Sequence, residues 1–100
     1  MERRLSGEEG SLIAAVADGP LFTELEGEFA ILSPKTGKYY TLDGVGALVW
    51  RHLQKKPQTF QALCDAVTQA YDVTPERCET DVKAFLSRLE EAKLVTLTRT

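Results

Sequence analysis

The sequence has few of the residues from which metal and enzyme sites are usually built. Its 100 residues include one histidine, His52, and two cysteines, Cys64 and Cys78. Two cysteines are too few for a disulfide framework, and their spacing is not that of a zinc knuckle. Each falls on the apolar face of an expected helix, so we interpret both as small buried side chains. No third group is placed to orient a cysteine–histidine pair, and we therefore expect no catalytic residue, no metal and no cofactor.

The chain also lacks a long apolar run and an excess of positive charge. A membrane-spanning helix needs about 20 apolar residues, whereas the apolar run at residues 12–17 is short and follows Glu8 and Glu9. We therefore expect no membrane span, no signal peptide and a cytoplasmic location. The net charge of −3 disfavours a nucleic-acid binder, whose affinity depends on clustered Lys and Arg.

The length and composition are typical of one small globular domain. Apolar residues make up 43% of the chain and charged residues 27%, an ordinary mixture for such a domain. Residues 1–10 are charged and show no periodicity, while residues 12–17 suit a strand, a helical turn or a flap. We expect residues 1–20 to be a flexible N-terminal extension and residues 21–97 to form the domain.

Three short β-type runs open this expected domain. Residues 21–26 and 28–33 are separated by Gly27, which suits a tight hairpin turn. A turn that contains proline and glycine then leads to residues 38–42, which are rich in aromatic and β-branched side chains. The pattern predicts a three-stranded antiparallel meander.

Three amphipathic helices are expected after the meander. Asp43 is positioned to cap a helix over residues 44–53, Thr59 to cap a second, and Thr74 to cap a third that continues to about Ala92. A short terminal strand at residues 94–97 is a further option. The order predicts an α+β fold, βββααα, with a winged helix-turn-helix-like arrangement.

Two glycines, Gly44 and Gly46, lie between the last strand of the meander and the first helix. Anions often bind at such a place, but a phosphate-binding loop would need a third glycine and a lysine. We interpret the two glycines as residues that allow a tight turn and close packing.

Residues 38–42 are expected to form an open edge of the sheet, because no strong strand follows them. Alternation places Tyr40 and Leu42 on one face and Tyr39 and Thr41 on the other. An edge strand exposes unpaired N–H and C=O groups, and addition of a peptide strand is a common use of such an edge. The alternative is that residues 94–97 cover it.

Several segments of the sequence resemble a known family. Residues 25–42, LEGEFAILSPKTGKYYTL, and the DGVGALVW that follows are similar to the PqqD-like family. The later pieces that agree are Thr59, Tyr71-Asp72-Val73, Asp81-Val82, Phe85-Leu86 and Lys93-Leu94-Val95. The resemblance covers about residues 21–97.

The resemblance implies a recognition element for precursors of ribosomally synthesised, modified peptides. In that family a leader peptide docks as an extra strand on the third strand and lies along the third helix. The chain is most similar to the standalone B1 proteins of lasso-peptide pathways, which hand the leader to a separate cysteine protease before a cyclase closes the ring. PqqD itself, which presents a precursor to a radical SAM enzyme, is the second option.

The candidate peptide-binding residues follow from the strand pattern and the resemblance together. They are Lys38, Tyr39, Tyr40, Thr41, Leu42, Asp81, Val82, Phe85, Arg88 and Leu89. We expect the backbone of residues 38–42 to pair with the peptide and the last helix to form the opposite wall. Phe85 and Leu89 are alternatively plain core residues, and Arg88 is alternatively a solvated side chain.

A winged-helix regulator that binds nucleic acid is the rival from another class. Its recognition helix should carry clustered positive charge, but the expected second helix has none, and the third mixes cations with acids. The sequence therefore favours peptide binding over nucleic-acid binding.

Overall fold

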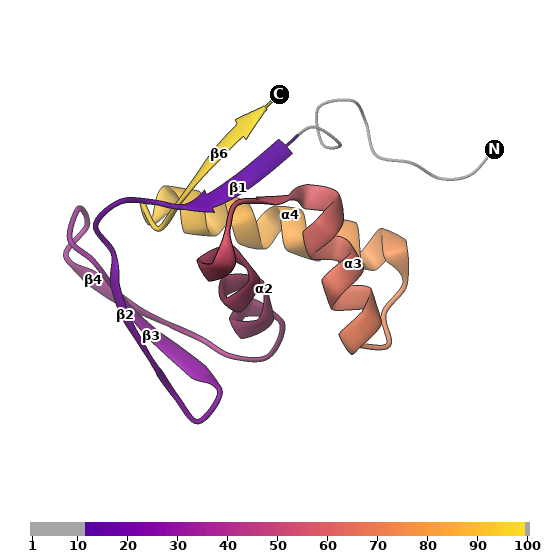
Figure 1. Cartoon of the computed structure of the whole chain (residues 1–100), viewed down its shortest axis with the longest axis horizontal. Coiled ribbons are helices and arrows are strands. Elements are labelled where there is room, and N and C mark those ends of the chain that lie inside the picture. The colour runs from indigo at the N-terminus through magenta and orange to yellow at the C-terminus, as the bar shows by residue number, and fades with distance from the viewer. Residues whose placement is uncertain (1–11, 100) are drawn as a thin grey trace.

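The computed structural model describes residues 12–99, which form two three-stranded antiparallel sheets and three helices (Figure 1). The elements in chain order are β1 (Leu12–Val16), β2 (Leu21–Leu25), β3 (Glu28–Ser33), β4 (Lys38–Leu42), α2 (Gly44–Lys55), β5 (Gln58–Thr59), α3 (Phe60–Ala70), α4 (Pro75–Glu91) and β6 (Val95–Arg99). The expected α+β class and the meander followed by three helices are confirmed.

The first sheet is the meander β2-β3-β4. Its first hairpin closes with two residues, Glu26 at φ 56° and Gly27 at φ 84°. Positive φ at both positions defines the type I′ turn, whose twist matches that of the flanking strands. Pairing is continuous along both ladders. Strand β2 pairs with β3 from Leu25 opposite Glu28 onward, and β3 pairs with β4 as far as Ser33 opposite Lys38.

The second sheet, in the order β5-β1-β6, was not expected as a sheet. Strand β1 occupies its centre, and two of its side chains, Leu12 and Ala14, are buried. Of the three forms considered for residues 12–17, the structure shows a strand, because pairing on both sides satisfies its backbone and burial of its side chains adds apolar area to the core. The rest of the expected N-terminal extension, residues 1–11, lies outside the described part of the chain.

Helices α3 and α4 begin directly after the two threonines that the sequence predicts as their N-caps. The Thr59 hydroxyl accepts a hydrogen bond from the Ala62 N–H at 3.0 Å, and the Thr74 hydroxyl accepts one from the Arg77 N–H at 3.2 Å. Asp43 occupies the N-cap of α2, as predicted, although its side chain makes no capping hydrogen bond. None of the helices within residues 12–99 is long and apolar enough to cross a membrane.

Helix α2 connects the two sheets, because it contacts strands of both and also α3. Trp50 on this helix is fully buried and meets Phe22 edge-to-face, with ring centroids 5.4 Å apart. Edge-to-face contact adds to the stabilisation from burial alone. The meander is thereby held to the helices through its first strand as well as its last.

A buried hydrogen bond joins the meander to the C-terminus of α4. The Ser33 hydroxyl donates to the Ala92 carbonyl at 2.8 Å, and Ser33 is fully buried. This bond holds the C-terminal end of β3 against the C-terminus of α4.

Ser33→Ala is expected to lower the free energy of unfolding by about 1–3 kcal/mol, because the Ala92 carbonyl would lose its buried side-chain donor. Urea unfolding followed by the fluorescence of Trp50, the single tryptophan, measures the change. Thr36→Ala removes an exposed hydroxyl in the next turn and should change stability by less than about 0.5 kcal/mol. Equal effects of the two substitutions would contradict the role of the Ser33 bond.

Candidate peptide-binding groove

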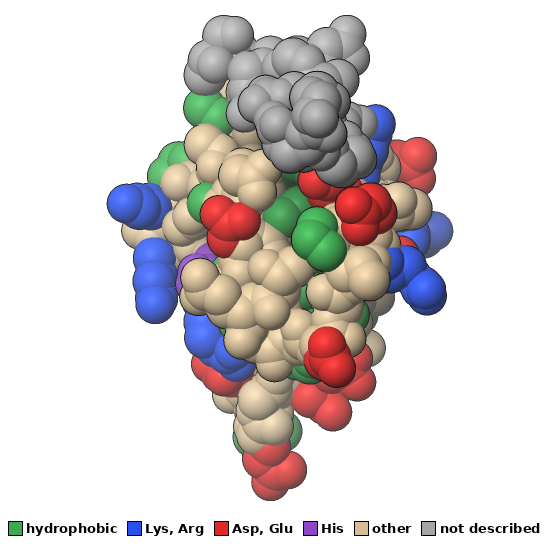
Figure 2. Space-filling model, turned by 90° about the vertical axis from the view of Figure 1, so that its right-hand side faces the viewer, with side chains coloured by type: hydrophobic (Ala, Val, Ile, Leu, Met, Phe, Trp, Pro, Cys, Tyr) green, Lys and Arg blue, Asp and Glu red, His purple; other side chains and the backbone are tan. Residues whose placement is uncertain are grey.

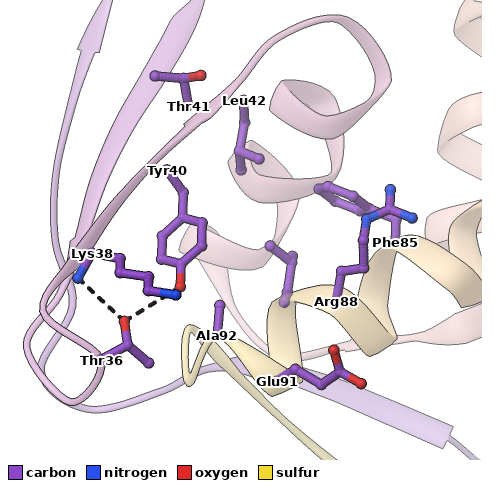
Figure 3. A pocket seen from close by; sticks show the side chains of 10 residues that line it. Thr36, Lys38, Tyr40, Thr41, Leu42, Phe85, Arg88, Glu91 and Ala92 are labelled. Atoms are coloured by element: carbon purple, nitrogen blue, oxygen red, sulfur yellow. Dashed lines mark hydrogen bonds between the residues drawn. The ribbon is translucent and has the colours of Figure 1, made fainter.

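A cavity of about 520 Å³ lies between β4 and the C-terminal half of α4 (Figure 3). Its lining residues are Thr36, Lys38, Tyr40, Thr41, Leu42, Phe85, Arg88, Leu89, Glu91 and Ala92. Tyr40 and Leu42 point from the strand toward the helix, whereas Thr41 points away. The alternation expected along β4 is therefore present, and its apolar side chains form one wall of the groove.

The backbone of β4 is oriented to bind a further strand. Leu25 and Glu28 flank a two-residue turn, so they form a hydrogen-bonded pair, and such pairs alternate along an antiparallel ladder. Residues 28, 30 and 32 of β3 therefore bond to β2, and residues 29, 31 and 33 bond to β4. It follows that the N–H and C=O groups of Tyr39 and Thr41 face away from β3, toward the groove.

Nothing within residues 12–99 pairs with this edge. The sheet order ends at β4, and β6 pairs with β1 instead. The alternative expectation, that residues 94–97 cover the edge, is therefore wrong. Lys93 takes φ 65° at the end of α4, and the Leu94 N–H bonds back to the Leu89 carbonyl at 3.0 Å, which turns the chain away from β4.

Phe85 is the central side chain of the opposite wall. Its ring lies against Gly46 of α2, where a Cβ atom would stand 3.1 Å and 3.3 Å from the Cζ and Cε1 ring atoms. The Arg88 guanidinium lies 5.9 Å from the ring centroid, within range of a cation–π interaction. Gly46 thus allows the ring to approach α2 closely, which confirms the close packing predicted for this glycine.

A second cavity of about 380 Å³ continues the groove past Phe85 toward the N-terminus of α2. The two cavities share Thr41, Leu42, Phe85 and Arg88. Asp81 lines the second cavity and forms an exposed ion pair with Arg77, N to O distance 3.1 Å. The groove is therefore long, apolar at its floor and lined by charged side chains at its margins.

The structure brings most of the candidate residues together. Seven line the first cavity: Lys38, Tyr40, Thr41, Leu42, Phe85, Arg88 and Leu89. Asp81 lines the second cavity of the groove but not the first. Tyr39, at 75% exposure, projects from the outer face of the sheet, and Val82, at 1%, is packed in the core. Neither of these two lines either cavity.

Three residues that line the first cavity were not among the candidates, nor were four that line the second, Asp43, Gly44, Val45 and Gly46. Glu91 and Ala92 lie three and four positions after Arg88 and extend the same helical face, so helical spacing would have found them. Thr36 lies in the turn before β4, and its hydroxyl is 3.3 Å from that of Tyr40. No pattern in the sequence indicates this contact.

The two cysteines are buried in the core, as the sequence predicts, and they lie next to each other. The Cys78 thiol donates to the Cys64 carbonyl at 3.5 Å. Burial raises the pKa of both thiols, and the neighbouring Cys78 adds to the rise at Cys64. Neither thiol is therefore activated as a nucleophile. Within residues 12–99 no group of three His, Cys, Asp or Glu side chains is placed to hold a metal.

The raised thiol pKa values predict a loss of stability at alkaline pH. Above about pH 9 the Cys64 thiol of the unfolded chain ionises while the buried one stays protonated, so it contributes a decrease of up to about 1.4 kcal/mol per pH unit in the free energy of unfolding, and Cys78 acts in the same direction. Urea unfolding at pH 8, 9 and 10 measures the slope, and Cys64→Ala should reduce it. An unchanged slope in that variant would contradict the assignment.

Comparisons with known proteins show the family of the chain and a similar fold. Residues 28–95 match the family described as Coenzyme PQQ synthesis protein D (PqqD). A solved structure, "TbiB1 in Complex with the TbiA(beta) Leader Peptide", superposes with a TM-score of 0.76 at 27% sequence identity, covering 81% of this chain and 93% of that one. A search of curated protein sequences finds no match.

Proposed function

Because the chain belongs to the PqqD family, we propose that it binds the leader segment of a ribosomally synthesised precursor peptide as an added strand beside β4. The observation that carries this proposal is the edge at Tyr39 and Thr41, which no strand within residues 12–99 pairs with and which lies along an apolar groove. Main-chain hydrogen bonds would supply affinity, and alternate side chains in the groove would supply selectivity. The similar TbiB1 structure contains a leader peptide, which supports the same assignment.

The dimensions of the groove indicate what it accepts. The five residues of β4 span about 17 Å at ~3.4 Å per residue, so about five leader residues pair with the strand. Every second one would point onto the floor formed by Leu42, Phe85 and Leu89, which favours apolar side chains. Arg88 and Lys38 are placed at the margin to contact polar or acidic neighbours.

A titration tests the proposal directly. The leader segment encoded beside the gene of this chain, carrying a fluorescent label, is titrated with the protein, and a scrambled leader serves as the control. Saturable polarisation with a Kd between micromolar and high nanomolar is expected, because a short strand buries little area and must be ordered on binding. No difference between leader and scrambled peptide would reject the proposal.

We further propose that the chain delivers the bound leader to a separate processing enzyme and is not itself a catalyst. A leader-removing cysteine protease that acts before a cyclase is the first choice, as in lasso-peptide pathways, and a radical SAM enzyme is the second. The buried, protonated thiols support a role in binding alone. The rate at which the protease removes the leader from the precursor is measured with and without this chain. A higher rate in the presence of the chain would favour the protease as its partner, and an unchanged rate would favour the radical SAM enzyme.

Nucleic acid is not a proposed ligand. Helix α3 carries no Lys or Arg, and on the face shown in Figure 2 basic and acidic side chains are interspersed. Phosphate binding would instead need clustered cations.

A further inference from the structure

A third cavity extends the groove beyond the end of β4. It has a volume of about 360 Å³ and is lined by Asp72, Val73, Thr74, Arg77 and Asp81. Asp81 also lines the second cavity, which in turn shares Phe85 and Arg88 with the first. The three cavities therefore form one row. The row ends at the connection between α3 and α4, and we call the third cavity the loop end of the groove.

One stripe of α4 lines the whole row. Its members recur at intervals of three or four residues, which places them on one face of the helix. They are Thr74, Arg77, Asp81, Phe85, Arg88 and Ala92. From Thr74 to Ala92 the helix rises about 27 Å at ~1.5 Å per residue, whereas the five residues of β4 span about 17 Å. About 10 Å of the row therefore lies beyond the strand, which is the length of about three extended peptide residues.

The charge of the lining side chains changes sign along this row. The charged side chains of the first cavity are two cations and one carboxylate, Lys38, Arg88 and Glu91. The loop end has the opposite balance, with two carboxylates, Asp72 and Asp81, and one cation, Arg77. A peptide that occupies the whole row therefore fits best when it carries a basic side chain at the loop end.

The carboxylates of the loop end are accessible to such a side chain. Asp81 pairs with Arg77 at 3.1 Å, and the two side chains are 58% and 74% exposed. Asp72 is exposed and forms no ion pair within residues 12–99. A cation from the peptide would therefore meet one unpaired carboxylate and could share the other with Arg77.

We propose that the leader continues past β4 along α4, and that a Lys or Arg side chain just outside its paired segment binds at the loop end beside Asp72 and Asp81. The inference rests on the proposed leader binding and adds a second point of recognition, which depends on charge and not on backbone pairing. Strand β4 runs toward the loop end. An antiparallel leader, the commoner kind of pairing, therefore has this basic residue within about four residues on the N-terminal side of its paired segment.

The test changes the charge of the loop end and leaves the apolar floor of the groove intact. Asp72→Lys introduces a cation, and Asp81→Asn, which removes one charge and keeps the size of the side chain, is the second variant. Asp65→Lys, at an exposed carboxylate of α3 that lines none of the three cavities, is the matched control. Folding is checked by urea unfolding with Trp50 fluorescence. The Kd for the labelled leader is measured at about 50 mM and about 500 mM salt, because salt screens exposed charges.

At the lower salt concentration Asp72→Lys is expected to raise the Kd about three- to tenfold and Asp81→Asn about twofold, with less than a twofold change for Asp65→Lys. These differences should shrink at the higher concentration. A leader whose Lys and Arg residues beside the paired segment are replaced by Glu should bind Asp72→Lys more tightly than it binds the unsubstituted chain.

Three results would overturn the inference and leave strand addition intact. They are an unchanged Kd for Asp72→Lys, an equal weakening by Asp65→Lys, and a loss of affinity that the charge-reversed leader does not restore. A leader without Lys or Arg beside the paired segment would overturn it as well. If the unsubstituted chain fails to bind leader, the proposed function itself is rejected, together with this inference.

Discussion

Thr41→Pro is expected to weaken leader binding at least tenfold while leaving the domain folded. The N–H of Thr41 faces the groove rather than β3, as the register of the meander requires. Proline removes this donor and places a ring where the added strand would lie, and edge strands tolerate proline where the N–H faces outward. Loss of a main-chain hydrogen bond costs about 1–3 kcal/mol, and the steric block by the proline ring adds to this cost, so the total exceeds the ~1.4 kcal/mol that corresponds to a tenfold weaker Kd.

The matched control is Thr41→Val, which keeps the N–H and the β-branched shape and removes only the hydroxyl. Its Kd for the labelled leader should stay within about threefold of the original, because an exposed hydroxyl contributes little. Both variants are checked by urea unfolding with Trp50 fluorescence. Normal leader binding by a folded Thr41→Pro variant would exclude strand addition at β4, even if the peptide still bound in the groove.

Gly46→Ala is expected to weaken leader binding about five- to tenfold without loss of stability. The new Cβ would stand 3.1 Å from the Cζ atom of Phe85, so the ring must move by a few tenths of an ångström, and it lines both cavities of the groove. Alanine is about 1 kcal/mol more favourable than glycine in a helix, which offsets the strain of the shifted ring. Stability and binding should therefore change independently.

A double-mutant cycle with Phe85→Ala isolates the cause. Phe85→Ala alone should weaken binding at least tenfold, since it removes the apolar centre of the groove. If Gly46 acts only by positioning this ring, Gly46→Ala should have no further effect on the Kd in the Phe85→Ala background. Additive effects would show that the glycine influences binding by another route, such as the backbone at the start of α2.

The local features of the fold could be read from the sequence because they depend on nearby residues. The hairpin at Gly27 and the caps at Thr59 and Thr74 are set by the φ angles and hydrogen bonds of a few consecutive residues. Alternation along β4 depends on a period of two and nothing more. These predictions are confirmed, and Asp43 also occupies its predicted N-cap position, although its side chain makes no capping hydrogen bond.

The second sheet could not be predicted in the same way. Strand β1 is a short apolar segment without clear alternation, and β5 has only two residues. Each becomes a strand because a partner distant in sequence, such as β6 for β1, satisfies its backbone groups. Pairing of this kind is decided by tertiary structure, since an isolated short strand has no stability in water.

By itself the sequence determined that this chain is a small α+β domain in which a strand at residues 38–42 ends a meander. Only the tertiary structure decided that β6 pairs with β1 and not with β4. It also decided which side chains meet across the groove, because Phe85, Gly46 and Leu42 come from three elements whose distances depend on core packing. Local periodicity fixes the direction of a side chain, but the formation of a site from distant elements is a property of the whole core.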